Sequence, residues 1–334
     1  MAFFLRSHPL FSTSPLARPR RRWMLAAALV ALGPARAPGC SECGCSLSSD
    51  WAAQGYGSLP GVQASLRYEY YEQSDLRSGT GQVDRSTLVF PNDAEIQQRT
   101  LNRNVWLGVD YVIDRTWGVS AQLPYYDRFH STIAEGDTEL STSHATGVGD
   151  LQIVGRYQSF TMTHGFGLQF GFKLPTGRID QNFATGPQAG EPLDRGLQLG
   201  AGTTNLLAGC SCFIRPSAKL GCFVQALVDQ PLNSRDGFRP APGLSLNGGL
   251  RYLNPGVVTP QLQLNLRWDG RESGPNADRD NSGDALAYVS PGATVDLGAR
   301  LHAFAFVQFP VYQRVNGLQL LPRWLLSVGF RHEF

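Results

Sequence analysis

The chain has 334 residues, of which 42% are hydrophobic and 17% charged, and it contains 37 glycines and 21 prolines. So much glycine and proline disfavours long helices, and no segment reaches the roughly 18 to 20 consecutive apolar residues that a membrane-spanning helix requires. The formal net charge is only +2, so we expect no clustered basic surface of the kind that binds nucleic acid.

The first 37 residues have the features of a secretory signal peptide. An arginine-rich stretch at 18–22 precedes an apolar run at 23–33, and residues 35–37 (ARA) form a small-x-small cleavage pattern. We therefore predict that residues 1–37 are removed on export. They hold six arginines and no acidic residue, so the mature chain has 29 − 6 = 23 basic against 27 acidic residues, a formal charge of −4.

From residue 61 onward, apolar and polar residues alternate with a period of two, which is typical of strands with one apolar and one polar face. The clearest example is 261–268 (QLQLNLRW). The pattern predicts twelve strands at about 61–72, 97–112, 116–126, 147–160, 163–174, 196–212, 218–228, 242–254, 259–269, 284–297, 300–310 and 322–334. Long predicted connections (73–96, 127–146, 175–195, 229–241, 270–283 and 311–321) alternate with short ones (113–115, 161–162, 213–217, 255–258 and 298–299).

This alternation predicts the fold class as all-β, a transmembrane antiparallel β-barrel of about 12 strands, spanning residues 61–334 in the outer membrane of a Gram-negative bacterium. Such barrels have an even number of strands, short periplasmic turns and longer outer loops, so both termini are expected in the periplasm. A soluble β-sandwich is the alternative. Aromatic residues toward strand ends favour the barrel, since they suit the girdles at the membrane interfaces; they are Tyr68, Tyr70, Tyr111, Tyr125, Tyr157 and Trp268.

The last predicted strand ends on Phe334, with apolar residues at alternate positions before it. This ending resembles the C-terminal assembly signal of outer-membrane barrels. It implies two partners for the chain, namely the barrel assembly machinery, through Phe334, and the lipid of the outer membrane.

Several short segments between residues 147 and 334 combine turn residues with the end of a strand. They are 147–151 (GVGDL), 173–177 (KLPTG), 199–204 (LGAGTT), 281–283 (NSG), 290–292 (SPG), 310–313 (PVYQ) and 316–320 (NGLQL). In this order and spacing they resemble landmarks of the bacterial outer-membrane transporters labelled "meta-pathway of phenol degradation". The resemblance implies an outer-membrane channel for aromatic or other hydrophobic small molecules, similar in broad role to the long-chain fatty-acid transporters. It implies no particular site residue.

Three cysteines follow the cleavage site, in a periplasmic N-terminal segment at 38–60. The spacing lacks the histidine of a c-type haem motif, and three thiolates are one ligand short of a structural zinc site. A disulfide or an ordinary tail, docking of a redox or metal-handling periplasmic partner, and a lipid anchor all remain open. The residues are Cys40, Cys43 and Cys45.

Three more cysteines, Cys210, Cys212 and Cys222, lie in the predicted strands 196–212 and 218–228. A hairpin turn centred on residue 216 would place Cys210 opposite Cys222, where a cross-strand disulfide is geometrically allowed. The alternative is that these cysteines are small apolar residues on the lipid-facing surface.

Charged residues on the polar faces are the candidates for the pore lining. They carry both signs, which fits either a hydrated, weakly selective pore or an ion-pair network that closes the barrel. The candidates are Arg67, Glu69, Asp110, Arg156, Lys173, Lys219, Arg251, Arg267 and Arg331, with His302 and Glu333 also on these faces.

Other polar motifs have simpler explanations. The loop at 276–284 (NADRDNSGD) has alternating oxygen ligands but lacks the glutamate that completes a calcium loop, so turn formation explains it better. His130 and His144 flank an acidic stretch that is either a metal site or a solvated loop. No Walker, zincin or nucleophile-elbow motif is present, and the histidine-x-serine pattern of outer-membrane phospholipases is missing, so we expect neither an enzyme nor a cofactor.

The sequence therefore predicts an outer-membrane channel that passes small hydrophobic or aromatic solutes by passive diffusion, with loops 73–96, 127–146 and 175–195 collecting or gating the solute. The alternative function is an outer-membrane scaffold whose cysteine-rich tail docks a redox or metal-handling partner.

Overall fold

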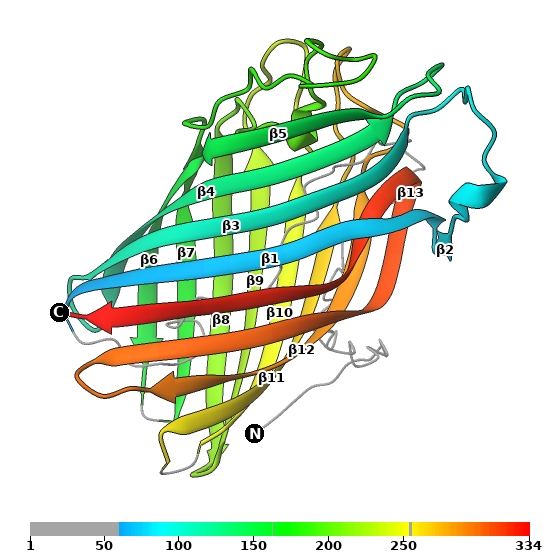
Figure 1. Ribbon diagram of the computed structural model, residues 1–334. Helices are drawn as coiled ribbons and strands as arrows, with labels where there is room; N and C mark the ends of the chain where they lie inside the picture. The colour runs from blue at the N-terminus through cyan, green and yellow to red at the C-terminus, as the bar shows by residue number, and fades with distance from the viewer. Residues whose placement is uncertain (1–59, 162, 254–255) are drawn as a thin grey trace, which may run out of the picture. The chain divides into compact units, whose positions relative to one another are not determined.

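The computed structural model describes residues 60–161, 163–253 and 256–334, which form one antiparallel sheet that closes on itself (Figure 1). β1 (Gly61–Gly79) pairs on one side with β3 (Ile96–Val112) and on the other with the last strand, β13 (Leu301–Glu333). That second pairing closes the barrel. The intervening strands are β4 (Trp117–Ile133), β6 (Leu151–Phe160), β7 (His164–Leu174), β8 (Asn205–Ser217), β9 (Leu220–Pro231), β10 (Gly243–Tyr252), β11 (Val258–Asp269) and β12 (Asp284–Asp296).

Among the described residues, eleven continuous strands form the closed wall, rather than the predicted twelve or so. The difference arises because β13 contains two antiparallel arms that the sequence pattern assigns to separate strands. The predicted long connection at 311–321 is wrong. β13 pairs with β12 through residues 302–315 and with β1 through 315–333. The chain reverses direction within it at Asn316–Gly317, where Gly317 has a φ of +55°, because a two-residue turn with glycine can join two antiparallel arms without a loop.

Two short strands lie outside the ring. β2 (Gly81–Gln82) pairs only with the end of β1, and β5 (Ser141–Val148) pairs with the outer half of β4. β6 takes over the pairing with the inner half of β4. The wall is therefore interrupted between β5 and β6, at Gly149 and Asp150.

Polar side chains face the inside of the barrel and apolar ones face outward, as the period-two alternation predicts. In β11, Gln261, Gln263 and Asn265 are at most 5% exposed, whereas Leu262 and Leu264 are 47% and 46% exposed. The inward amides bond one another across strands, with Asn265 Nδ2 donating to Asn247 Oδ1 at 2.8 Å. Hydrogen bonds of this kind offset part of the cost of removing these amides from bulk water.

Aromatic residues on the outer surface gather toward the strand ends. Trp117 packs edge-on against Tyr157 near the short turns, with ring centroids 5.0 Å apart. Tyr70 and Trp324 approach to 5.6 Å near the middle of β1. Such rings, apolar in body and polar at the tip, suit the two boundaries between membrane and water.

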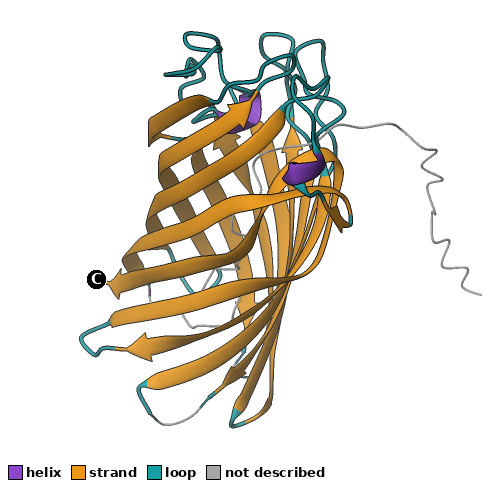
Figure 2. Ribbon diagram, turned by 45° about the vertical axis from the view of Figure 1, so that its right-hand side comes forward, coloured by secondary structure: helices purple, strands orange, loops and turns teal. Residues whose placement is uncertain are grey.

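Connections at the two ends of the barrel differ strongly in length. Among the described residues, short turns at 113–116, 218–219 and 297–300 lie at the end where the Phe334 backbone N–H donates to Val62 O at 2.9 Å. Figure 2 shows the long loops, together with the two short helices η1 (Arg85–Thr87) and η2 (Arg195–Leu197), gathered at the other end. Within the described part of the chain, no helix has the length and apolar character needed to cross a membrane.

The expected register of the cysteine hairpin is wrong. Cys222 pairs with Ile214, and Cys210 pairs with Ala226, because the turn centres on residues 218–219 rather than 216. Within the described ranges Cys210, Cys212 and Cys222 are free thiols. The tail cysteines at 40, 43 and 45 lie outside the described residues, as does the predicted signal peptide.

Candidate functional site

The longest loop, 175–204 between β7 and β8, folds into the mouth of the barrel. Sequence periodicity predicts a strand from residue 196, but β8 begins only at Asn205. The residues between belong to the loop, where η2 places three leucines against the inner wall. Leu193, Leu197 and Leu199 are each at most 4% exposed. Burial of these side chains favours the inward position of the loop, because each removes apolar surface from water.

Two inward-facing polar residues fasten this loop to the wall. From β4, Arg128 Nη1 donates to Gly196 O at 2.9 Å and Gln198 O at 3.4 Å. At the interruption between β5 and β6, the Asp150 carboxylate accepts from Gly177 N at 2.9 Å and Ala201 N at 2.8 Å. Both charged groups are about 94% buried, and their bonds to backbone are of the charge-assisted kind.

Glycine is required where the two ends of the loop cross. A Cβ atom on Gly200 would lie 2.6 Å from Gly177 O and from Asp150 Oδ1, and one on Gly177 would lie 2.7 Å from Gly200 Cα. Contacts this short do not occur for real Cβ atoms, so only glycine lets the backbones approach. Three of the sequence landmarks, at 147–151, 173–177 and 199–204, thus meet at one point in space and anchor the loop.

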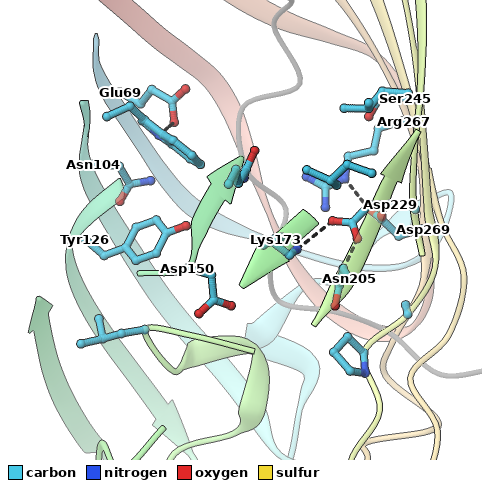
Figure 3. A pocket seen from close by; sticks show the side chains of 18 of the residues that line it. Glu69, Asn104, Tyr126, Asp150, Lys173, Asn205, Asp229, Ser245, Arg267 and Asp269 are labelled. Atoms are coloured by element: carbon cyan, nitrogen blue, oxygen red, sulfur yellow. Dashed lines mark hydrogen bonds and ion pairs between the residues drawn. The ribbon is translucent and has the colours of Figure 1, made fainter. Parts of the chain in front are cut away.

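A cavity of about 220 Å³ lies inside the barrel beside these anchors, which contribute to its lining (Figure 3). Figure 3 shows Glu69, Asn104 and Tyr126 on one side and five polar residues facing them from β7 to β11. Glu69 accepts a hydrogen bond from Trp106 Nε1 at 2.9 Å. The facing residues are Lys173, Asn205, Asp229, Arg267 and Asp269.

Charges around this cavity are paired. Lys173 Nζ lies 2.7 Å from Asp229 Oδ2, and Asn205 Nδ2 donates to Asp229 Oδ1 at 2.6 Å. Arg267 forms an ion pair with Asp269. Because pairing offsets the desolvation of each ion, the lining offers hydrogen-bonding groups of both kinds without a large excess of either charge.

Toward the short-turn end the lumen narrows. A second cavity of only about 60 Å³ is lined by three guanidinium groups and one carboxylate. Arg156 Nη2 lies 2.8 Å from Asp110 Oδ1, and Arg67 Nε lies 3.0 Å from Glu69 Oε1. The third, Arg331, lies 3.5 Å from Glu333. These guanidinium groups occupy space that a solute would have to cross.

Four phenylalanines also point inward in this half of the barrel. Phe213 and Phe223 are cross-strand partners on β8 and β9, and Phe304 and Phe306 lie on β13. All four are at most 7% exposed. The inner wall here therefore combines arginine with bulky apolar side chains, which narrows the passage to small molecules.

The structure places eight of the nine predicted pore-lining residues on the inner face, and Lys219 is the exception. Lys219 lies in the exposed turn between β8 and β9, so its assignment to the pore lining is wrong. The two histidines that flank the acidic stretch do not share a site. His144 is exposed, with Nε2 2.7 Å from Asp127 Oδ1, whereas His130 is buried and only 1% exposed.

Sequence reasoning missed four residues of the central cavity and its anchors, namely Arg128, Asp150, Asp229 and Asp269.

No protein-family model matches the chain, and no curated protein matches it in sequence. Its structure is similar to an outer-membrane channel from Pseudomonas putida F1, with a TM-score of 0.60, 14% sequence identity, and coverage of 84% of this chain and 98% of that one. The two chains share a fold, the closed antiparallel β-barrel. This likeness confirms the predicted all-β antiparallel barrel of the outer-membrane type.

Two further solved structures have lower scores. The Pseudomonas putida toluene transporter TodX gives a TM-score of 0.43 at 9% identity, covering 90% of this chain and 96% of that one. The CymD monoaromatic hydrocarbon channel gives 0.40 at 10% identity, covering 83% and 89%. The interior of the barrel is divided into a mouth filled by loop 175–204, a central polar cavity and a narrow arginine-lined end.

Proposed function

We propose that the protein is an outer-membrane channel through which small hydrophobic or aromatic solutes diffuse passively. The observation that carries this proposal is the cavity inside a closed barrel, directly beneath a loop that occupies the mouth. The family resemblance to the "meta-pathway of phenol degradation" transporters belongs to the same proposal, as do an orientation with both termini in the periplasm and assembly through Phe334.

The size and lining of the cavity limit the solutes. A space of about 220 Å³ is below the range of pockets that hold drug-sized ligands, so it suits molecules of about one aromatic ring. Tyr71, Trp106 and Tyr126 supply aromatic surface, while the ion pairs supply hydrogen bonds. Paired charges favour neutral solutes, because an ion would have to displace an existing partner.

Loop 175–204 is the gate in this proposal. Arg128 and Asp150 hold it inward by bonds to backbone atoms, which form or break without any change in the wall. Passage requires the loop to shift, since its leucines fill the mouth above the cavity. Loops that close and open on the microsecond to millisecond timescale control access in many proteins.

The test replaces residues 180–195 with a short glycine-serine linker and measures entry of a neutral probe, benzyl alcohol, into proteoliposomes. Faster entry than with the wild type is expected, because the mouth is cleared. The matched control shortens the loop at 85–92, between β2 and β3, because loop 134–140 contacts the gating loop through the bond from Gln188 Nε2 to Asp137 Oδ2 at 2.8 Å. Circular dichroism and heat-modified mobility on gels report that each barrel is folded. The proposal would be contradicted if the wild type and the linker variant both fold and the probe enters neither kind of proteoliposome faster than empty liposomes.

A further inference from the structure

One residue lines both cavities of the lumen. Trp106, on the inward face of β3, contributes to the central cavity of about 220 Å³ and to the narrow cavity of about 60 Å³. Among the described residues, no other belongs to both linings. The side chain is partly exposed, between the buried Asn104 and Gly108 on the same face. The indole therefore stands at the boundary between the two spaces, and a solute that moves from one to the other has to pass it.

One buried carboxylate fixes the position of this indole. Trp106 Nε1 donates to Glu69 Oε2 at 2.9 Å, while Arg67 Nε lies 3.0 Å from the other oxygen, Oε1. Arg67 and Trp106 are directly opposite each other on β1 and β3, and the guanidinium carbon lies 4.9 Å from the indole centroid. The indole is thus held by a hydrogen bond to a charged group and by a cation–π contact, and it must give up both to swing away from the wall.

A second ring extends this aromatic surface toward the mouth. Tyr126 of β4 meets Trp106 edge-on, with ring centroids 6.3 Å apart and ring planes at 90°. The guanidinium of Arg128, which bonds to loop 175–204, lies 5.5 Å from the Tyr126 ring. The two rings therefore lie between two arginines, one at the narrow end of the lumen and one beneath the loop. A contact between rings is available to an aromatic solute and not to a saturated one.

We propose that Trp106 is the specificity-determining residue of the lumen and selects neutral aromatic solutes over saturated ones. In the central cavity the ring of the solute packs against the indole, and the solute reaches the narrow end when the indole swings away from Glu69. This inference rests on the proposed function, because it names the residue that discriminates between solutes inside the channel. The ion pairs across the cavity offer hydrogen bonds to aromatic and saturated alcohols alike, so they do not distinguish the two.

Fluorescence quenching tests the contact without any need for transport. The purified protein in detergent micelles is titrated with 4-nitrobenzyl alcohol, a neutral aromatic whose nitro group quenches tryptophan on contact. A saturable component of quenching is expected for the wild type and for the matched control Trp117→Phe, on the outer face, where the ring packs against Tyr157. It should be absent from Trp106→Phe, with heat-modified mobility on gels showing that each barrel is folded. A wild type without a saturable component, or a component that persists in Trp106→Phe, would overturn the proposal.

Competition against the quencher measures the selectivity. Benzyl alcohol and its saturated counterpart, cyclohexylmethanol, are compared as competitors after correction for their partition into micelles. Benzyl alcohol should compete roughly 2- to 13-fold better, which is the effect of one aromatic pair beyond the area that it buries. Equal competition by the two alcohols would show that the ring contact does not set the selectivity.

Entry into proteoliposomes tests the boundary between the cavities. In the 180–195 linker variant, where the loop no longer limits access, Trp106→Ala should speed the entry of both alcohols and lower the ratio of benzyl alcohol to cyclohexylmethanol. An unchanged ratio would refute selection by Trp106. If no variant admits either alcohol faster than empty liposomes, the proposed channel function fails, whereas the quenching result still decides whether Trp106 binds aromatic rings.

Discussion

Replacing Arg128 with methionine should release loop 175–204 from the barrel mouth. Methionine keeps much of the apolar stem but removes the donors to Gly196 O and Gln198 O, at 2.9 and 3.4 Å. A hydrogen bond from a charged group contributes about 1.5–3 kcal/mol. Because the second contact is long, we expect the inward position to lose about 2–4 kcal/mol, which shifts the loop equilibrium roughly 30- to 700-fold.

Trypsin cleavage after Arg195 measures this opening, because the peptide bond lies in η2 at the inner end of the loop. The assay is run with Arg178→Gln in every protein, since Arg178 is 72% exposed and would be cut first. When opening and closing are faster than cleavage, the cleavage rate follows the open population. Mass spectrometry identifies the cut.

The matched control is Arg103→Met, a half-exposed arginine on β3 that lies 3.6 Å from Asp127 on the outer face. It should cleave at the wild-type rate. If Arg128→Met also cleaves at that rate while the barrel remains folded, Arg128 does not hold the loop, and the argument from its hydrogen bonds is refuted.

Four other outcomes are expected. The pKa of Asp194, which the surrounding protein raises to about 8, means that the inward position of loop 175–204 favours the protonated carboxyl, so this position should become less stable as pH rises through 8. Cleavage after Arg195, corrected for trypsin activity, should therefore accelerate from pH 7 to 9. The variant Asp194→Asn should not show this acceleration. Leu264→Arg on the lipid face should destabilise folding into vesicles by about 2–4 kcal/mol, measured by urea titration. Lys173→Met leaves Asp229 without its cation, so the reversal potential should shift toward cation selectivity. If the N-terminal tail is not part of the channel, solute entry should be unchanged when serine replaces Cys40, Cys43 and Cys45; loss of a co-purifying periplasmic partner in this variant would instead support the scaffold function.

The strands of the wall could be predicted because the polarity of each residue indicates whether its side chain faces the lumen or the lipid. In β11, alternation of glutamine with leucine records directly which side chains face the lumen and which face lipid. The turn within β13 could not be found in the same way. Leu320 and Leu321 are both buried, so the alternation breaks there, and Asn316–Gly317 is too short a signal to outweigh a presumed loop.

The candidate site was predicted only in part, because it depends on contacts between distant segments. Lys173 and Arg267 fall on polar strand faces and were found by alternation. Asp150 instead accepts from two loop amides, at residues 177 and 201, and its sequence position shows only a turn. The glycine-rich segments did mark these positions, but nothing in the sequence brings them together. The predicted turn of the cysteine hairpin, at residue 216, likewise lies two to three residues before the observed turn at 218–219, so every predicted cross-strand pair of that hairpin is shifted.

Single-channel conductance in planar bilayers tests the central claim most directly, by comparing the wild-type protein with the 180–195 linker variant. The account predicts small or infrequent conductance steps for the wild type, because the loop fills the mouth, and larger, persistent steps for the variant. If both proteins fold and neither conducts, the lumen is closed below the loop, at the narrow arginine-lined end. The barrel would then not be a channel gated by loop 175–204.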